Sequence, residues 1–316
     1  MAGHIDAKRK KKHTAGNESP ALHSLITSRY WREFITRASP FAQEPNDSIE
    51  VRLSDAITDI EKLSDRDYLI RKHHRKVRIG DAIEGGRPSF ADEEFAILSR
   101  HRRTLLRFDG LYAPISTTRF GLFSFLGRTR KQLFVSQDTF RGGIQWVVSL
   151  GRSPHVIYDG RAWLAGREVD DMSLVDLDSD GIYEISVPTC IFYGFASLSP
   201  GATPLPTIIF KYSRKAKRYL PANPRFADYL LSKIEERKQN IQPIGGPVNN
   251  MNHLGDVLGI VLDYIFAGRE RAAWTFYDQA YKLPDKDKIK KEIRAELRDS
   301  PIYRFIYRKH ARPRRT

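Results

Sequence analysis

Residues 176–184 read DLDSDGIYE, which places three aspartates at alternate positions, then a glycine and then a glutamate. Alternate spacing directs the three aspartates toward one point when the chain curls into a loop. Gly181 permits the sharp backbone turn that such a curl requires, and Glu184 returns to the same point. An oxygen-only set of this kind suits Ca²⁺ better than a transition metal. The predicted ligands are the side chains of Asp176, Asp178, Asp180 and Glu184 and the carbonyl of Ile182.

The flanks of this loop predict strands rather than helices. Residues 172–175 form a short apolar run before the loop, and residues 185–187 alternate after it. An EF-hand would need a bidentate glutamate at the twelfth position of the loop, and Val187 stands there. The stretch therefore predicts a strand–loop–strand unit in an antiparallel β domain, and not an EF-hand.

The loop resembles the calcium loops of FG-GAP/VCBS repeats, the units of integrin-type β-propellers, which follow the pattern D-x-D-x-D-G-x-x-D/E. The matching residues are Asp176, Asp178, Asp180, Gly181 and Glu184. The resemblance implies a bound structural Ca²⁺. It covers one copy, and a propeller needs several copies at a fixed period, so a complete propeller is not expected. Residues 207–212 and 217–221 look like the strand pair that follows such a loop in uncharacterised bacterial proteins.

The alternative is an aspartate-rich turn without metal, since Asp and Gly are ordinary turn residues. Four crowded carboxylates would repel one another without a cation, which favours metal binding. A structural role for the metal is favoured over a catalytic one, because no nucleophile or base stands nearby in the sequence.

Composition is that of a soluble globular protein. The chain has 316 residues, of which 41% are hydrophobic and 29% charged, so it is long enough for two domains. One cysteine, Cys190, excludes an intrachain disulfide, and its apolar neighbours indicate an inert thiol.

The net charge of +15 is concentrated at the two ends of the chain. Such ends can contact nucleic acid or another polyanion without sequence preference, although a solvated, disordered tail is the favoured interpretation. The basic residues of these ends are Lys8, Arg9, Lys10, Lys11, Lys12, Arg308, Lys309, Arg312, Arg314 and Arg315.

The sequence signals do not agree on the cellular compartment of the protein. Residues 1–23 contain no apolar core of a secretory signal, which predicts a cytoplasmic protein by default. The most apolar run, residues 257–266, is too short to span a membrane and contains Asp263. The calcium loop instead suggests an extracytoplasmic location, because cytosolic Ca²⁺ is scarce.

Between residues 24 and 106 the apolar spacing predicts helices. We expect them at residues 24–35, at 49–63, at 65–77 with Asp65 as its cap, and from a capping sequence at Ser89. The basic run at residues 71–76 would then be a solvated helix face, or a surface for an acidic partner.

The spacing changes to two between residues 106 and 219. Strands are predicted at residues 121–126, 132–136, 144–150 and 155–158, with Asp159-Gly160 as a hairpin turn. Close spacing without intervening helices predicts antiparallel pairing.

After Pro221 the pattern predicts helices again. The expected elements are a helix at 224–238, a linker loop at 239–252, helices at 254–267 and 269–283, a helix at 286–297 capped by Asp285, and a closing segment at 301–308. Residues 272–284 resemble the second helix of a tetratricopeptide repeat, although a helical hairpin packed on the β domain is preferred. Trp274, Tyr277, Tyr303 and Phe305 are expected to be packing residues, with a partner-binding groove as the alternative.

These observations predict an α+β protein with a helical N-terminal region, a central antiparallel β domain carrying the calcium loop, and a C-terminal helical hairpin region. The expected segments are a disordered basic tail at 1–20, a helical region at 21–105, the β domain at 106–221, a helical region at 222–310 and a basic tail at 311–316.

Three functions are compatible with the sequence. The first is a non-catalytic binding or scaffold protein, of unknown partner, whose β domain is stabilised by Ca²⁺. The second is a protein that associates with nucleic acid or another polyanion through its basic tails. The third is a hydrolase with a site assembled in three dimensions, for which His155 is the histidine of interest. No G-x-S-x-G, H-E-x-x-H or Cys–His pattern is present, so the balance is against an enzyme.

Overall fold

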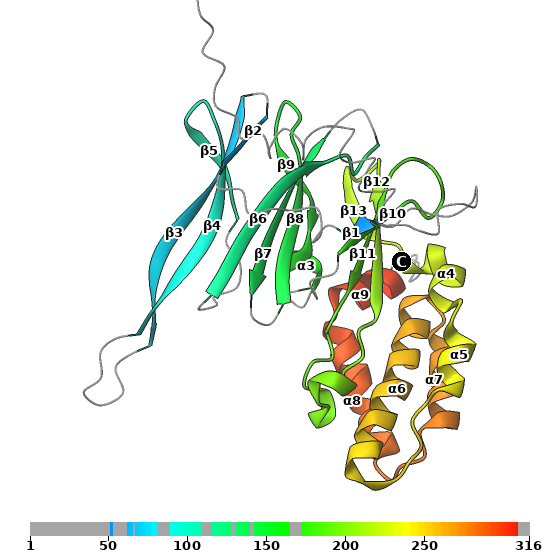
Figure 1. The fold of residues 1–316 in the computed structure, drawn as a ribbon. Coiled ribbons are helices and arrows are strands. Elements are labelled where there is room, and N and C mark those ends of the chain that lie inside the picture. Colours follow the sequence, from blue (N-terminus) through cyan, green and yellow to red (C-terminus); the bar gives the residue numbers. More distant parts are fainter. Residues whose placement is uncertain are drawn as a thin grey trace, which may run out of the picture.

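Two β-sheets and a group of C-terminal helices make up the described part of the chain (Figure 1). The structure is a computed structural model. It describes residues 51–52, 62–65, 67–80, 89–108, 115–127, 131–139, 142–164 and 172–308. The predicted mixture of α and β structure is confirmed within these residues.

The larger sheet has eight strands in the described residues, in the order β2-β3-β4-β6-β7-β8-β9, with β5 also paired to β4. Its strands are β2 (Lys62–Asp65), β3 (Tyr68–Gly80), β4 (Ser89–Arg100), β5 (Arg103–Phe108), β6 (Ile115–Phe123), β7 (Gln132–Thr139), β8 (Gly142–Ser149) and β9 (His155–Asp159). Neighbours pair antiparallel except β4 and β6, which are parallel where Asp92 pairs with Ile115. The predicted antiparallel pairing is thus confirmed for β6 to β9, whereas β2 to β4 lie in the region that was predicted to be helical.

The smaller sheet has five antiparallel strands in the described residues, in the order β1-β10-β11-β12-β13. The strands are β1 (Val51–Arg52), β10 (Ser173–Val175), β11 (Glu184–Pro188), β12 (Thr207–Ser213) and β13 (Arg218–Pro221). Strands β10 and β11 flank the acidic loop, as predicted, because short apolar strands on both sides favour a hairpin. The register of β11 and β12 pairs Ile185 with Phe210.

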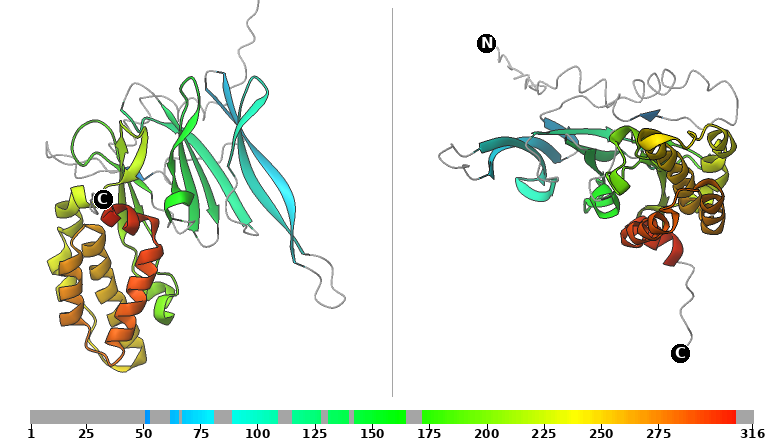
Figure 2. Two further views of the ribbon diagram at one scale, coloured as in Figure 1. Left: turned by 180° about the vertical axis from the view of Figure 1, so that it is seen from behind. Right: turned by 90° about the horizontal axis from the view of Figure 1, so that it is seen from below.

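The helices lie mostly at the C-terminal end of the chain. They are α3 (Gly160–Leu164), α4 (Ala227–Leu231), α5 (Ile234–Gln239), α6 (Gly246–Phe266), α7 (Glu270–Ala280), α8 (Lys286–Asp299) and α9 (Pro301–Arg308). Both views in Figure 2 place α4 to α9 at one end of the molecule and the β3–β4 hairpin at the other. None of the helices in the described ranges is long and apolar enough to cross a membrane.

Two hydrophobic clusters hold these layers together. The first joins both sheets to the helices, with Phe134 of β7, Phe210 of β12 and Val261 of α6 among its buried residues. The second lies within the larger sheet and includes Ile70 of β3 and Leu98 of β4. The first cluster connects the acidic loop's sheet to the helical layer, so the helices support the strands that carry the loop.

The predicted helices at 65–77 and from Ser89 are wrong. Both segments are strands, β3 and β4, which pair along almost their full length. Ser89 begins β4, and Asp65 ends β2 instead of capping a helix. Apolar residues four positions apart lie on one face of a helix and also on one face of a strand, so this spacing does not distinguish the two. The pairing of β3 with β4 shows that both segments are strands. The expected helix at 24–35 and most of the one at 49–63 lie outside the described residues.

Several boundaries near the β domain and the C-terminal helices also differ from expectation. Asp159-Gly160 is not a hairpin turn: Gly160 begins α3, and the Asp159 carboxylate accepts a hydrogen bond of 3.2 Å from the Ala162 N–H. The expected linker at 239–252 is helical from Gly246. Pro247 lies in the first turn of α6, where its missing N–H costs no hydrogen bond, because the first N–H groups of a helix have no partner within the helix.

The predicted helix at 224–238 is broken into a 3₁₀ turn (Asn223–Phe226) and the two short helices α4 and α5. Asp285 precedes α8 but gives no side-chain cap, since its carboxylate accepts a hydrogen bond of 3.1 Å from the Tyr281 hydroxyl. The expected helices at 254–267, 269–283 and 286–297 correspond to α6, α7 and α8.

Candidate functional site: an acidic loop closed by a lysine

The acidic loop connects β10 to β11 and is closed by hydrogen bonds from its own backbone. The Asp176 carboxylate accepts from the N–H of Asp180 at 3.1 Å and from the N–H of Gly181 at 3.0 Å. Ser179 and Gly181 adopt positive φ angles of 56° and 77°, which let the chain reverse. The aspartate that opens the loop therefore sets its curvature.

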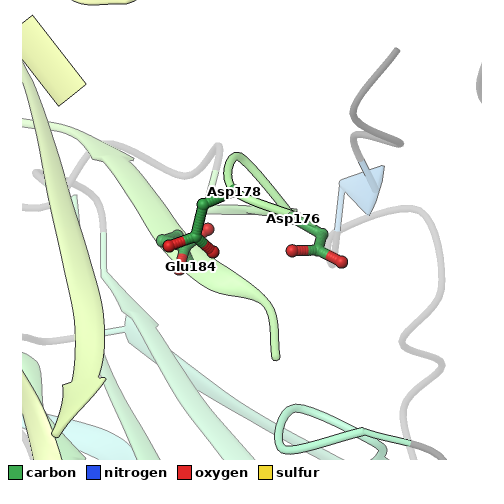
Figure 3. Close-up of side chains that lie close together, drawn as sticks. All are labelled: Asp176, Asp178 and Glu184. Atoms are coloured by element: carbon green, nitrogen blue, oxygen red, sulfur yellow. The ribbon is translucent and has the colours of Figure 1, made fainter. Parts of the chain in front are cut away.

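Three carboxylates converge around this loop (Figure 3). One oxygen each of Asp176, Asp178 and Glu184 lies within 4.8 Å of the others. Two oxygens on opposite sides of a Ca²⁺ ion would be about 4.6 to 5.2 Å apart, given Ca–O distances of 2.3 to 2.6 Å. The three side chains could therefore hold a metal ion, and their ligand atoms are all oxygens.

A lysine from a neighbouring strand is inserted among the carboxylates. The Lys211 ammonium on β12 donates to Glu184 Oε1 at 2.7 Å, to Asp180 Oδ2 at 2.9 Å and to Asp178 Oδ1 at 3.0 Å. Because Ile185 pairs with Phe210, Lys211 lies beside Glu184 on the adjacent strand. Its three donors thus take up positions on the loop that a metal ion would also use.

A second cation reaches the outer edge of the loop. An Arg225 Nη atom lies 2.5 Å from Asp178 Oδ2, so Asp178 contacts both Lys211 and Arg225. Arg225 belongs to the 3₁₀ turn that precedes α4. The loop is therefore connected to the start of the helical layer as well as to the sheet.

Burial and hydrogen bonding shift the protonation equilibria of the loop. The Glu184 side chain is 0% exposed, and burial raises the pKa of its carboxyl, although hydrogen bonds from Lys211 and from the Leu177 N–H oppose that rise. Burial alone would lower the pKa of Lys211, but its hydrogen bonds to Glu184, Asp180 and Asp178 raise it well above its ordinary value. Lys211 is therefore charged throughout the physiological range.

Asp180 and Ile182 occupy different positions from the three converging carboxylates. Asp180 Oδ1 accepts from the Ile182 N–H at 2.9 Å, and its other oxygen accepts from Lys211. Burial would raise the pKa of Asp180, but the hydrogen bonds from Lys211 and the Ile182 N–H, together with the positive charges of Lys211 and Arg214, lower it. The structure thus brings Asp176, Asp178 and Glu184 together and connects Asp180 to them through the lysine.

The end of the loop is attached to the larger sheet. The Tyr183 N–H donates to the Phe125 carbonyl at 3.0 Å, and the buried Tyr219 hydroxyl donates to the Tyr183 carbonyl at 3.0 Å. Burial raises the pKa of Tyr219 strongly, so its hydroxyl stays protonated. These bonds hold the backbone just before Glu184 in place.

Two participants, Lys211 and Arg225, were not expected from the sequence. Lys211 stands in a run that was predicted only as a strand, and its position opposite Glu184 depends on the register of β11 and β12. Arg225 follows Lys211 by fourteen positions and reaches Asp178 only through the fold. A basic residue on a strand that follows an acidic loop is the sole sequence signal, and it is weak without the register.

The other sequence candidates do not join this site. His155 begins β9 and is exposed, with its Nδ1 3.2 Å from the Ser153 carbonyl oxygen. Cys190 is half-buried. Tyr277 is buried and Trp274, Tyr303 and Phe305 are partly buried, which agrees with their expected packing role. The basic tail residues Lys8, Arg9, Lys10, Lys11, Lys12, Arg312, Arg314 and Arg315 lie outside the described residues.

Comparison with other proteins assigns no role to this loop. Comparisons with known protein families, with curated proteins and with solved structures found no match for this chain.

Proposed function

We propose that this protein is a non-catalytic binding or scaffold protein whose acidic loop takes up Ca²⁺ and thereby stabilises the β domain. The observation that carries the proposal is the convergence of Asp176, Asp178 and Glu184, whose oxygens lie within 4.8 Å of one another. Asp180 and the carbonyl of Ile182 are the further ligands that we propose. A bound ion would join β10 and β11 at the point where their ladder of hydrogen bonds ends.

The charge balance of the loop supports a divalent cation. The loop brings four carboxylates together, and the ion pairs of the described residues supply Lys211 and Arg225 as partners. Four negative and two positive charges leave this group with a net charge of −2, although Lys211 contacts three of the four carboxylates. A divalent ion would add the two positive charges that balance this excess, whereas a further lysine would add only one.

Lys211 is the competitor that Ca²⁺ must displace in this proposal. Its ammonium makes hydrogen bonds to three of the carboxylates, so calcium binding requires the lysine side chain to move outward. Four rotatable carbon–carbon bonds allow such a movement without a change in the backbone. The apparent calcium affinity should therefore be lower than that of the same loop without the lysine.

A hollow beside α7 supports the binding component of the proposal. Its volume is about 620 Å³, and Lys238, Tyr264, Arg271 and Phe276 contribute to its lining. The Lys238 ammonium lies 5.3 Å from the centroid of the Tyr264 ring and 5.6 Å from that of Phe276. Aromatic rings beside cations suit a protein segment with apolar and acidic side chains.

The test compares the thermal stability and calorimetric Ca²⁺ binding of the full chain and of two variants. Unfolding is followed with Ca²⁺, with Mg²⁺ and with a chelator. We expect Ca²⁺ to raise the melting temperature of the unmodified chain, D178A to abolish that rise, and K211M to bind Ca²⁺ more tightly. K215M, at an exposed position in the β12–β13 turn, is the control for K211M.

The outcomes are distinguishable. A calcium-specific shift that D178A retains would show that the ligand assignment is wrong. Absence of any calcium-specific response in both the unmodified chain and K211M would reduce the loop to a turn neutralised by Lys211 and Arg225.

A further inference from the structure

The outward side of strands β2 to β5 carries a concentration of cations around an aromatic ring. We define the basic face by its side chains Lys62, Arg71, His73, Arg75, Phe95, Ile97 and Arg107. Figure 1 shows these strands at the end of the larger sheet that is remote from the helices. The surface is therefore separate from the acidic loop.

Strand alternation creates this face from a run that was misread as a helix. On β3, Ile70 points into the second hydrophobic cluster, so Arg71, His73 and Arg75 lie on the opposite side of the sheet. Lys72 and His74 lie on the inner side, where both contact the Glu94 carboxylate. The alternation thus separates the basic run at 71–76 into an inner and an outer set.

The strand register makes the outer set contiguous. Arg71 pairs with Lys62 on one side and with Ile97 on the other, and Ile97 in turn pairs with Arg107. His73 pairs with Phe95. Arg71, Arg75 and Arg107 are exposed, while Phe95 and Ile97 are half-buried between them. The face therefore consists of an apolar strip with cations on both sides.

Flat groups stack on one another at the centre of this strip. The rings of His73 and Phe95 are 5.3 Å apart between centroids and inclined by 16°. The Arg107 guanidinium carbon lies 4.2 Å from the Phe95 centroid, and that of Arg75 lies 5.5 Å away. Imidazole, phenyl and guanidinium groups are the side-chain surfaces on which unpaired nucleobases stack.

The local potential on this face is positive. The pKa of His73 is lowered, first by burial and then by the charges of Arg71, Arg107 and His74. In the strand register, Arg75 of β3 pairs with Glu93 of β4. Lys62 of β2 and Arg71 of β3 are paired across the two strands, so an anion bound beside them would reduce the repulsion between their charges.

We propose that the basic face binds single-stranded nucleic acid, with phosphates contacting Lys62, Arg71 and Arg107 and with an unpaired base stacking on the His73–Phe95 pair. A single strand is favoured over a duplex because its bases present their flat faces, whereas a duplex keeps them stacked inside. A protein partner would not require stacked rings between the cations. The surface lies in the described strands and does not depend on the basic ends of the chain.

The experiment measures fluorescence anisotropy of labelled twenty-nucleotide oligo-dT and oligo-U with the full chain at several salt concentrations. The R71A/R107A variant removes two cations from the face, and K215A/R218A removes two from the exposed β12–β13 hairpin as the matched control. Both variants keep the basic ends of the chain, so any contribution of these ends to oligonucleotide binding is the same in all samples. Thermal unfolding of each variant verifies the fold.

We expect R71A/R107A to bind either oligonucleotide roughly tenfold more weakly near physiological salt, and to lower the slope of log affinity against log salt by about 1.4. K215A/R218A should match the unmodified chain. Folded H73A should also bind more weakly while retaining the salt slope, because it removes stacking and leaves the three phosphate contacts unchanged.

Equal binding by R71A/R107A and the unmodified chain would overturn the proposal. An equal loss of affinity for single-stranded DNA, duplex DNA and heparin, with no effect of H73A, would identify a general polyanion surface and would overturn the assignment to single strands.

Discussion

The ammonium of Lys211 lies 2.7 Å from an oxygen of the fully buried Glu184, and the same ammonium donates to Asp178 and Asp180. The lysine comes from β12 and the glutamate begins β11, so the contact ties the acidic loop to the centre of its sheet. A buried carboxylate that loses such a partner becomes strongly unfavourable. The stability of this region therefore depends on which cation neutralises Glu184.

Replacement of Lys211 by methionine should destabilise the chain in the absence of calcium. K211M leaves Glu184 buried without its ammonium partner, and we expect a loss of about 3 kcal/mol in the free energy of unfolding. Urea unfolding in chelator measures it. E184Q removes the charge, so K211M/E184Q should lose less than the sum of the two single variants. Additive losses would show that Lys211 does not stabilise Glu184.

The hydroxyl of Tyr219 on β13 is expected to stabilise the backbone at the end of the acidic loop. It donates to the Tyr183 carbonyl at 3.0 Å from a buried position. Y219F keeps the ring and removes this bond, which should lower the free energy of unfolding by about 1 kcal/mol. Y229F, at an exposed ring on α4, is the control and should change little. Equal unfolding curves for Y219F and the unmodified chain would contradict this role.

Gly255 on α6 permits the close approach of the 3₁₀ turn Pro200–Ala202. A Cβ atom at this position would overlap with the Ala202 carbonyl oxygen, a contact that requires the backbone to shift. We expect G255A to lower the free energy of unfolding by about 1 to 3 kcal/mol, despite the better helix propensity of alanine. At Gly151 an added Cβ would meet nothing within 4 Å, so G151A serves as the control in the same urea titration. A neutral or stabilising G255A would show that the loop moves away at little cost.

The pH dependence of stability should contain a contribution from Asp263 on α6. Burial raises the pKa of this carboxyl to about 6, although the ion pair with Arg237 opposes the rise. Between about pH 4 and pH 6 the folded chain holds a proton that the unfolded chain has released. The free energy of unfolding should therefore fall as the pH rises through this window, by on the order of 3 kcal/mol from this residue.

D263N removes this titration and provides the test. We expect the variant to show a flatter dependence of unfolding free energy on pH between 4 and 6 than the unmodified chain. Carboxyls with a lowered pKa, such as Asp180 and Asp278, lose their stabilising effect below this window and are common to both proteins. Parallel curves for the two proteins would contradict the raised pKa of Asp263.

The sequence by itself determined the elements whose pattern is local. Strands β7, β8, β10 and β11 were predicted because apolar alternation and close turns specify a hairpin within about twenty residues. Helices α6, α7 and α8 were predicted from apolar residues at helical spacing and from the breaks at Gly268 and Pro284 between them. The acidic loop was also predicted from the sequence, because its carboxylates and glycine lie within the nine positions 176–184.

Only the tertiary structure decided the elements and contacts that depend on distant residues. Strands β3 and β4 pair over a long hairpin, and that pairing overrides a spacing that also suits a helix. The same alternation collects Arg71, His73 and Phe95 on one face. Lys211 reaches Glu184 through the register of two strands, which no local pattern specifies. Local spacing encodes which elements can form, whereas cross-strand pairing and burial determine which side chains meet.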